Sequence, residues 1–201
     1  MKPLIFCICL IFSLKTVSNA QVSATDKSIT FYGLDFSKSK MVGNDGFSNP
    51  SDIVNRIFGE WNNLLVNEKS KYDVKFAFNK SEVDYDFDIV NKRNLSVNAS
   101  ELVSNNSYSF DEKTVASIVK GYSTKNKKLG IVFIVEKFDK TEEKASVFIT
   151  YFDPSSKKVL LTKRMTAAPV GFGFRNYWAG AIAKILKQSN SVSKQWEAAS
   201  K

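Results

Sequence analysis

Three consecutive apolar segments in the second half of the chain restrict its possible folds more than any other feature. They are LGIVFIVEKF (129–138), KASVFITYF (144–152) and KKVLLTKRM (157–165). Each has the length and the β-branched, aromatic composition of a strand. The short polar turns FDKTEEKA and DPSSK connect them, and connections of this length join antiparallel neighbours. The segments predict an antiparallel meander, with Ile131–Val135, apolar on both faces, in a central strand.

The remaining segments mix helical and strand patterns. Asn49 and Pro50 are typical of a helix start, and apolar residues then recur at helical spacing to about Lys69. A second helix is expected after a cap at Asp111, and a last one after GFGFRN, with an apolar stripe facing inward (Tyr177, Trp178, Ile182, Ile185 and Leu186). The other expected elements are strands at 29–37, 72–78 and 81–90, and loops at 38–50 and 91–110.

The resulting order of elements is β-α-β-β-α-β-β-β-α. Mixed alternation of this kind predicts an α/β (α+β) fold, in which three helices pack on a mixed sheet of about six strands. About 180 residues can form one hydrophobic core, so a single domain is expected over residues 21–201. The polar residues from about 188 are expected to form a C-terminal tail.

The first 20 residues have the three-part layout of a secretory signal peptide. Lys2 provides the positive start, Pro3–Leu14 is a short apolar run, and small residues precede Gln21. The run is too short for a membrane-spanning helix, which needs about 20 residues. We therefore expect cleavage after Ala20 and a secreted or periplasmic protein, with no transmembrane segment in the mature chain.

The residue types that are missing exclude several classes of chemistry. The chain has no His, and its two cysteines lie within the expected leader. A mature chain without His or Cys cannot form the usual nucleophile systems or His- and Cys-ligated zinc sites. Loss of Lys2 and Lys15 with the leader would lower the formal net charge from +9 to +7. A basic protein favours anionic surfaces such as phospholipid or lipopolysaccharide, although scattered lysines also simply promote solubility.

Four carboxylates alternate with apolar residues in SEVDYDFDIV (81–90). Glu82, Asp84, Asp86 and Asp88 would therefore point from the same face of a strand. Calcium needs six to eight oxygen ligands, and the EF-hand pattern fails because Ile89 occupies the glycine position. We expect a solvent-facing strand surface here and no metal site. An acidic pair for a hydrolase remains the alternative.

The segment GFGFRN (171–176) is the candidate binding site. Gly171 and Gly173 precede a helix, where backbone amides can bind an anion. The guanidinium of Arg175 can donate further hydrogen bonds to the same anion. The motif lacks the further residues of a nucleotide fingerprint, so a tight turn with packing aromatics is the structural alternative. Trp178 is expected to lie on the inner side of the last helix, buried in the core. The alternative is that it belongs to an aromatic patch that faces a partner.

The segment KASVFITYFDPSSKKVLLTKRM (144–165) resembles a hairpin of a periplasmic α/β domain. That domain is shared by the curli secretion-pore family and the N-terminal domain of the Tol propeller protein. The turn here has SSKK where those families usually carry glycine, and their lipidated cysteine is missing. The leader and GFGFRNYW also resemble small secreted Bacteroidetes proteins of unassigned role. The resemblance implies an envelope binding or assembly module and no catalytic residues.

These observations predict a non-catalytic, secreted or periplasmic cell-envelope protein. Its partner is expected to be an envelope protein or an anionic surface component, with no nucleic acid and no cofactor. Two alternatives stay open, a carboxylate-dependent hydrolase and a lipid- or anion-binding carrier. A pocket bordered by acidic pairs would favour the first, a deep apolar cavity the second, and an exposed aromatic patch the binding module.

Overall fold

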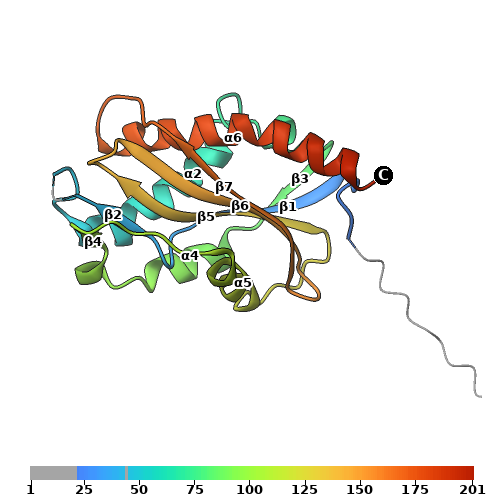
Figure 1. Ribbon diagram of the computed structural model, residues 1–201, viewed down its shortest axis with the longest axis horizontal. Coiled ribbons are helices and arrows are strands. Elements are labelled where there is room, and N and C mark those ends of the chain that lie inside the picture. The colour runs from blue at the N-terminus through green and yellow to red at the C-terminus, as the bar shows by residue number, and fades with distance from the viewer. Residues whose placement is uncertain (1–21, 44) are drawn as a thin grey trace, which may run out of the picture.

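The computed structural model describes residues 22–43 and 45–201 as a mixed seven-stranded sheet with helices on both faces (Figure 1). The expected leader, 1–20, lies outside the described residues. The strands are β1 (Ser28–Asp35), β2 (Lys40–Val42), β3 (Glu82–Tyr85), β4 (Val103–Ser104), β5 (Leu129–Asp139), β6 (Lys144–Asp153) and β7 (Lys158–Ala167). The helices are α1 (Pro50–Asp52), η1 (Ile53–Ile57, a π-helical segment), α2 (Phe58–Asn67), α3 (Val74–Phe78), α4 (Asp88–Leu95), η2 (Ala99–Glu101), α5 (Glu112–Lys120) and α6 (Phe174–Ala199).

The long strand β5 organises the sheet. On one side it pairs antiparallel with β6, and β6 pairs antiparallel with β7, which confirms the predicted meander. On the other side β5 pairs in parallel with β1 along its first half and with β2 near its end. The short strands β3 and β4 extend the sheet in parallel from β1 and β2. The centre of the sheet therefore combines parallel and antiparallel pairing, as the mixed α/β class requires.

The sheet separates two hydrophobic layers. On β5, Phe133 and its alternate neighbours face the layer formed with α2, α3 and α6. Val132 and Ile134 face the opposite layer, formed with α4 and α5. Figure 1 shows α6 along one side of the sheet and α4 and α5 along the other. Burial on both sides explains why this strand is apolar on successive residues rather than on alternate ones.

Two predicted helix starts are confirmed by their caps. The Asn49 side chain accepts a hydrogen bond from the Asp52 amide at 3.0 Å, and Pro50 begins the helical run that continues to Asn67. The Asp111 side chain accepts from the Thr114 amide at 2.9 Å, at the start of α5. Both caps satisfy backbone donors that have no partner within the helix.

The strand predicted at 72–78 is wrong, because this segment forms the short helix α3. The Asp73 side chain caps it by accepting from the Phe76 amide at 2.9 Å, and Asn79 ends it in the left-handed conformation, with φ 55°. The strand predicted at 81–90 is correct only for Glu82–Tyr85, since α4 begins at Asp88. Short apolar runs fit either periodicity, and here local capping and packing select the helix.

Other differences come from short elements in polar segments. The loop predicted at 38–50 contains β2, and the loop predicted at 91–110 contains the end of α4, η2 and β4. The sheet therefore has seven strands instead of six, with more helices and a different order of elements. The last helix also continues through the polar residues from 188 to Ala199. Within the described ranges, no helix is both long and apolar enough to cross a membrane.

Candidate binding surface

The alternating carboxylates do not converge on a site. On β3, Glu82 is exposed and Asp84 is half-buried, and Lys128 Nζ lies 3.2 Å from Glu82 Oε1 and 2.7 Å from Asp84 Oδ2. The hydrogen bond to Asp84 raises the pKa of Lys128. Asp86 and Asp88 lie beyond the strand, and Asp88 stands in the first turn of α4. No group of three or more potential metal ligands occurs in the part of the chain that the structure describes. On β3 the two carboxylates form a surface that one lysine partly compensates.

A buried carboxylate that sequence reasoning missed lies at the end of β1. Asp35 is completely buried and accepts hydrogen bonds from Tyr122 Oη at 2.7 Å, Arg93 Nε at 3.1 Å and the Ser37 amide at 2.7 Å. Burial, together with the Asp35 carboxylate, raises the pKa of Tyr122 well above its usual range. These contacts join α4 and the turn after α5 to the sheet, so we assign Asp35 a structural role.

A second buried carboxylate, Glu136, lies on the same side of the sheet. It accepts from Arg164 Nη2 at 2.9 Å, Ser146 Oγ at 2.6 Å and the Phe110 amide at 2.9 Å. A buried charge is tolerated when it is paired and hydrogen-bonded in this way. Asp35 and Glu136 are each paired with an arginine inside the fold, so we assign Glu136 a structural role as well.

The first half of the GFGFRN segment lies in an exposed loop between β7 and α6, and Phe174–Asn176 form the first turn of α6. Gly171 and Gly173 adopt φ values of 136° and 77°, a region that favours glycine. Between them, the Phe172 side chain is 96% exposed, and Val170 is 52% exposed. The loop crosses α6 closely at Gly180, where an added Cβ would lie 1.9 Å from the Val170 carbonyl oxygen. The glycines thus permit a loop conformation in which apolar side chains face solvent.

One wall of a surface groove is formed by this loop and the others by α3 and α6. The groove has a volume of about 650 Å³. Phe76, Val170, Ala183 and Leu186 contribute apolar lining, and Lys71, Lys184 and Lys187 contribute cations. We call this feature the apolar groove. Lys184 Nζ donates to the Ala168 carbonyl at 2.9 Å, which ties the base of the loop to α6.

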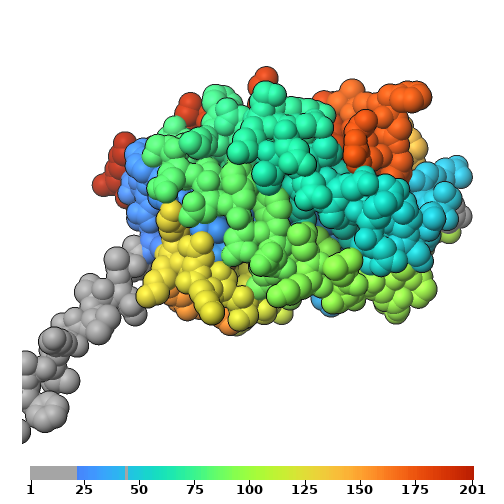
Figure 2. Space-filling model, turned by 180° about the vertical axis from the view of Figure 1, so that it is seen from behind, coloured from blue at the N-terminus to red at the C-terminus, as the bar shows by residue number. Residues whose placement is uncertain are grey.

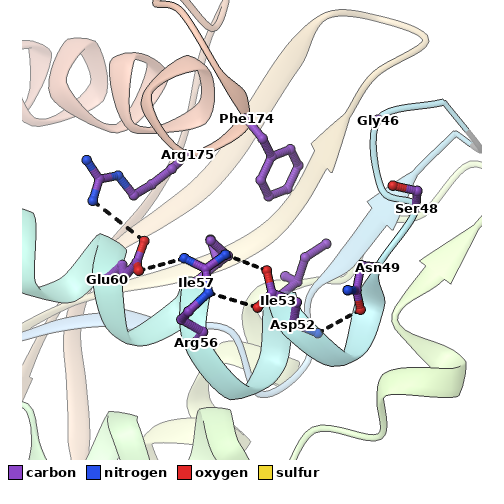
Figure 3. Close-up of a pocket in the computed structure, with 10 residues that line it drawn as sticks. All are labelled: Gly46, Ser48, Asn49, Asp52, Ile53, Arg56, Ile57, Glu60, Phe174 and Arg175. Atoms are coloured by element: carbon purple, nitrogen blue, oxygen red, sulfur yellow. Dashed lines mark hydrogen bonds and ion pairs between the residues drawn. The ribbon is translucent and has the colours of Figure 1, made fainter.

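Arg175 lies outside the apolar groove, in a separate polar hollow of about 460 Å³ (Figure 3). Arg56 donates to Asp52 and to Glu60, and its bonds lower the pKa of Asp52. Arg175 Nη1 lies 3.6 Å from Glu60 Oε2, so the two arginines share this carboxylate. Of the predicted binding residues, Gly171 lines the apolar groove and Arg175 lines the polar hollow. The backbone turn at Gly171 and the guanidinium of Arg175 therefore do not form one anion-binding site.

Trp178 is 1% exposed, which confirms its predicted burial. Its ring stacks on Phe138 at 4.7 Å between centroids and on Phe47 at 5.6 Å. The indole of Trp61, beside the same cluster, donates from Nε1 to the Arg175 carbonyl at 2.9 Å. The Trp178 side chain anchors α6 to the core and is not available as a surface contact.

Exposed large hydrophobic residues concentrate around the apolar groove. In the described ranges they are Phe76, Leu95, Val170 and Phe172. Phe76 and Val170 line the groove, and Phe172 lies at the tip of the loop that forms its wall. Leu95 stands apart, at the end of α4. A local concentration of this kind marks an interaction surface, whereas a single exposed apolar residue is ordinary.

Comparison with protein-family models and with curated proteins finds no match. The resemblance of residues 144–165 to the curli and Tol domains, and the resemblance to small secreted Bacteroidetes proteins, therefore remain predictions. The candidate binding surface rests on the geometry of this chain alone.

Proposed function

We propose that this protein is a non-catalytic binding module of the bacterial cell envelope, exported by its leader. It engages an envelope component through the apolar groove and the Phe172 loop. The absence of His and Cys from the expected mature chain restricts its nucleophile and metal chemistry. The two buried carboxylates described above are bound by arginines, which supports a binding role over the hydrolase alternative.

The exposure of Phe172 is the observation that carries this proposal. A phenyl ring that is 96% exposed contributes almost no burial energy to the fold. Its loop is nevertheless held against α6, because the Val170 amide donates to the Tyr177 carbonyl at 3.1 Å and the chain crosses the helix closely at Gly180. An ordered loop that holds an aromatic ring in solvent is typical of a binding surface with a preformed anchor.

Co-sedimentation with isolated bacterial envelopes tests the proposal. We expect the purified exported protein to sediment with envelopes, and Phe172→Ala to weaken this association at least tenfold, as expected for loss of an aromatic anchor. Leu95→Ala is the matched control, because Leu95 is 60% exposed but remote from the groove. The proposal fails when the wild type stays in the supernatant, or when both variants behave alike.

Mass spectrometry tests the export step independently. We expect the exported protein to begin at Gln21, in agreement with the small residues that precede it. An intact Met1 in the exported fraction would contradict cleavage by a signal peptidase.

A further inference from the structure

We infer that the component bound by this surface is an anionic phospholipid bilayer, with Phe172 and Val170 entering the interface between headgroups and acyl chains. This inference rests on the proposed function and specifies its ligand. It is drawn from three properties of the surface: its lysines, its apolar side chains and the projection of the loop.

Lysines line the apolar groove and continue along α6 beyond it. Lys184 and Lys187 line the apolar groove, and Lys194 lines a neighbouring hollow that shares Phe76 with it. Lys187 and Lys194 are both exposed and stand seven residues apart on α6, so they follow one stripe of the helix. Lys75 also lines the neighbouring hollow.

Few carboxylates oppose this charge. The one acidic residue of α6 is Glu197, which is buried and pairs with Lys80 at 2.7 Å. Within the described ranges, no carboxylate lies within ion-pair distance of Lys75, Lys187 or Lys194. Asp73 lines the groove but caps α3. Cations without acidic partners complement an anionic surface, and long lysine side chains can reach headgroups while their stems cover apolar area.

The apolar side chains have the arrangement that shallow insertion requires. Figure 2 shows the loop as an orange knob that stands out from the body at the upper edge of the molecule. Phe172 and Val170 are exposed apolar residues of this loop. A protein interface usually engages about 20–30 residues on each side. A few apolar residues flanked by lysines are instead sufficient to enter about 5–10 Å into a headgroup region.

Vesicle sedimentation tests the inference. The probes are vesicles of phosphatidylcholine alone and vesicles with about one third phosphatidylglycerol, a composition chosen to create a negative surface. We expect binding of the wild type only to the anionic vesicles, and weaker binding at high salt because salt screens the attraction. Phe172→Ala should lower the partition coefficient at least about tenfold. Phe172→Trp should retain binding, because an aromatic ring with a polar edge suits the interface.

A pair of double variants separates the local charge from the total charge. Lys187→Gln/Lys194→Gln should lower partitioning about 30-fold, from the usual contribution of two lysines near an anionic surface. Lys113→Gln/Lys120→Gln removes two exposed lysines with the same seven-residue spacing on α5, which covers the opposite face of the sheet. This control should bind as the wild type does. Equal losses in both double variants would overturn the inference.

The failure of this inference can be told apart from the failure of the proposed function. Protease treatment of isolated envelopes removes exposed proteins and leaves the lipids. Binding that survives this treatment, together with binding to anionic vesicles, supports the lipid surface. If protease treatment abolishes binding to envelopes and the protein does not bind vesicles, the partner is a protein. That result would support the proposed function and contradict the lipid inference. Equal binding to neutral and anionic vesicles would also overturn it.

Discussion

Phe172 and Trp178 are six positions apart in the chain, yet one is 96% exposed and the other 1% exposed. Both belong to the same aromatic segment, GFGFRNYW. Phe172 precedes α6, between two glycines with positive φ values, and its side chain faces solvent. Trp178 lies within α6, on the side that faces the sheet and stacks on Phe138.

The difference shows that aromatic composition alone does not distinguish an anchor in the core from an anchor for a partner. The helical periodicity determines the position of Trp178, because it lies on the same apolar face of α6 as the residues that pack on the core. The backbone conformation of Gly171 and Gly173 decides the position of Phe172. The following predictions test this comparison, in order of decreasing effect on stability.

Trp178→Ala is expected to have the largest effect. Emptying a large aromatic site in the core should lower the free energy of unfolding by about 3–5 kcal/mol. Chemical denaturation monitored by circular dichroism measures this loss. A change below about 1 kcal/mol, which is typical of surface substitutions, would contradict the core role of Trp178.

Gly180→Ala tests the close contact between α6, which carries Trp178, and the loop that carries Phe172. The new methyl group would clash with the Val170 carbonyl, so α6 or the loop must move. We expect a loss of about 3 kcal/mol, near the upper end of the usual cost of overpacking. Gly59→Ala is the matched control, because it also lies in a helix and its added Cβ would meet nothing within 4 Å. That variant should gain about 0.5–1 kcal/mol from helix propensity. Equal melting temperatures for the two variants would contradict the close crossing.

Glu197→Gln tests how the far end of α6 is held. Burial would raise the pKa of Glu197, but hydrogen bonds from Lys80 and Asn79, both at 2.7 Å, outweigh it and lower this pKa below its usual 4.5. The carboxylate therefore stabilises the fold fully above pH 4.5, and this contribution is lost as the pH falls through the lower folded-state pKa. The substitution should cost about 1.5–3 kcal/mol at pH 7.

Denaturation curves at several pH values measure this dependence. The difference between wild type and Glu197→Gln should shrink as the pH falls below 4.5. Glu68→Gln is the control, because Glu68 and its partner Lys71 are exposed, and it should change stability little at either pH. A difference for Glu197→Gln that stays constant from pH 7 into the acid range would contradict the ion pair.

Phe172→Ala is expected to have the smallest effect on stability. An almost fully exposed ring contributes little burial, so the free energy of unfolding should change by no more than about 0.5 kcal/mol. Thermal melting followed by circular dichroism measures this change. A large drop in melting temperature would show that Phe172 packs against the fold in solution, and the comparison with Trp178 would no longer hold.

The regular part of the fold could be predicted from sequence because local and tertiary preferences agree there. The meander has long apolar strands and short turns, and the helix starts at Asn49 and Asp111 have capping side chains that form the expected bonds. The α3 segment shows the limit. Its seven-residue pattern fits a strand, but the Asp73 cap and packing against α6 make it a helix.

The candidate surface could be predicted only in part, because its walls are far apart in the chain. Gly171 and Gly173 were recognisable from their position before a helix. Phe76 was not recognisable, because its exposure depends on α3, which the sequence pattern assigned to a strand. Arg175 was grouped with the glycines by proximity in sequence, but it turns to Glu60 in a different hollow.

Local sequence was sufficient for the α/β class, the antiparallel meander, the two capped helices and the burial of Trp178, because side-chain periodicity and capping act within a few residues. Tertiary packing determined that β1 and β2 share one edge of β5, that α3 lies beside α6, and that Phe172 remains in solvent. These features depend on contacts between residues far apart in the chain, such as Ala77 and Ser193, which are 116 positions apart, and no local pattern contains the free energy of such contacts.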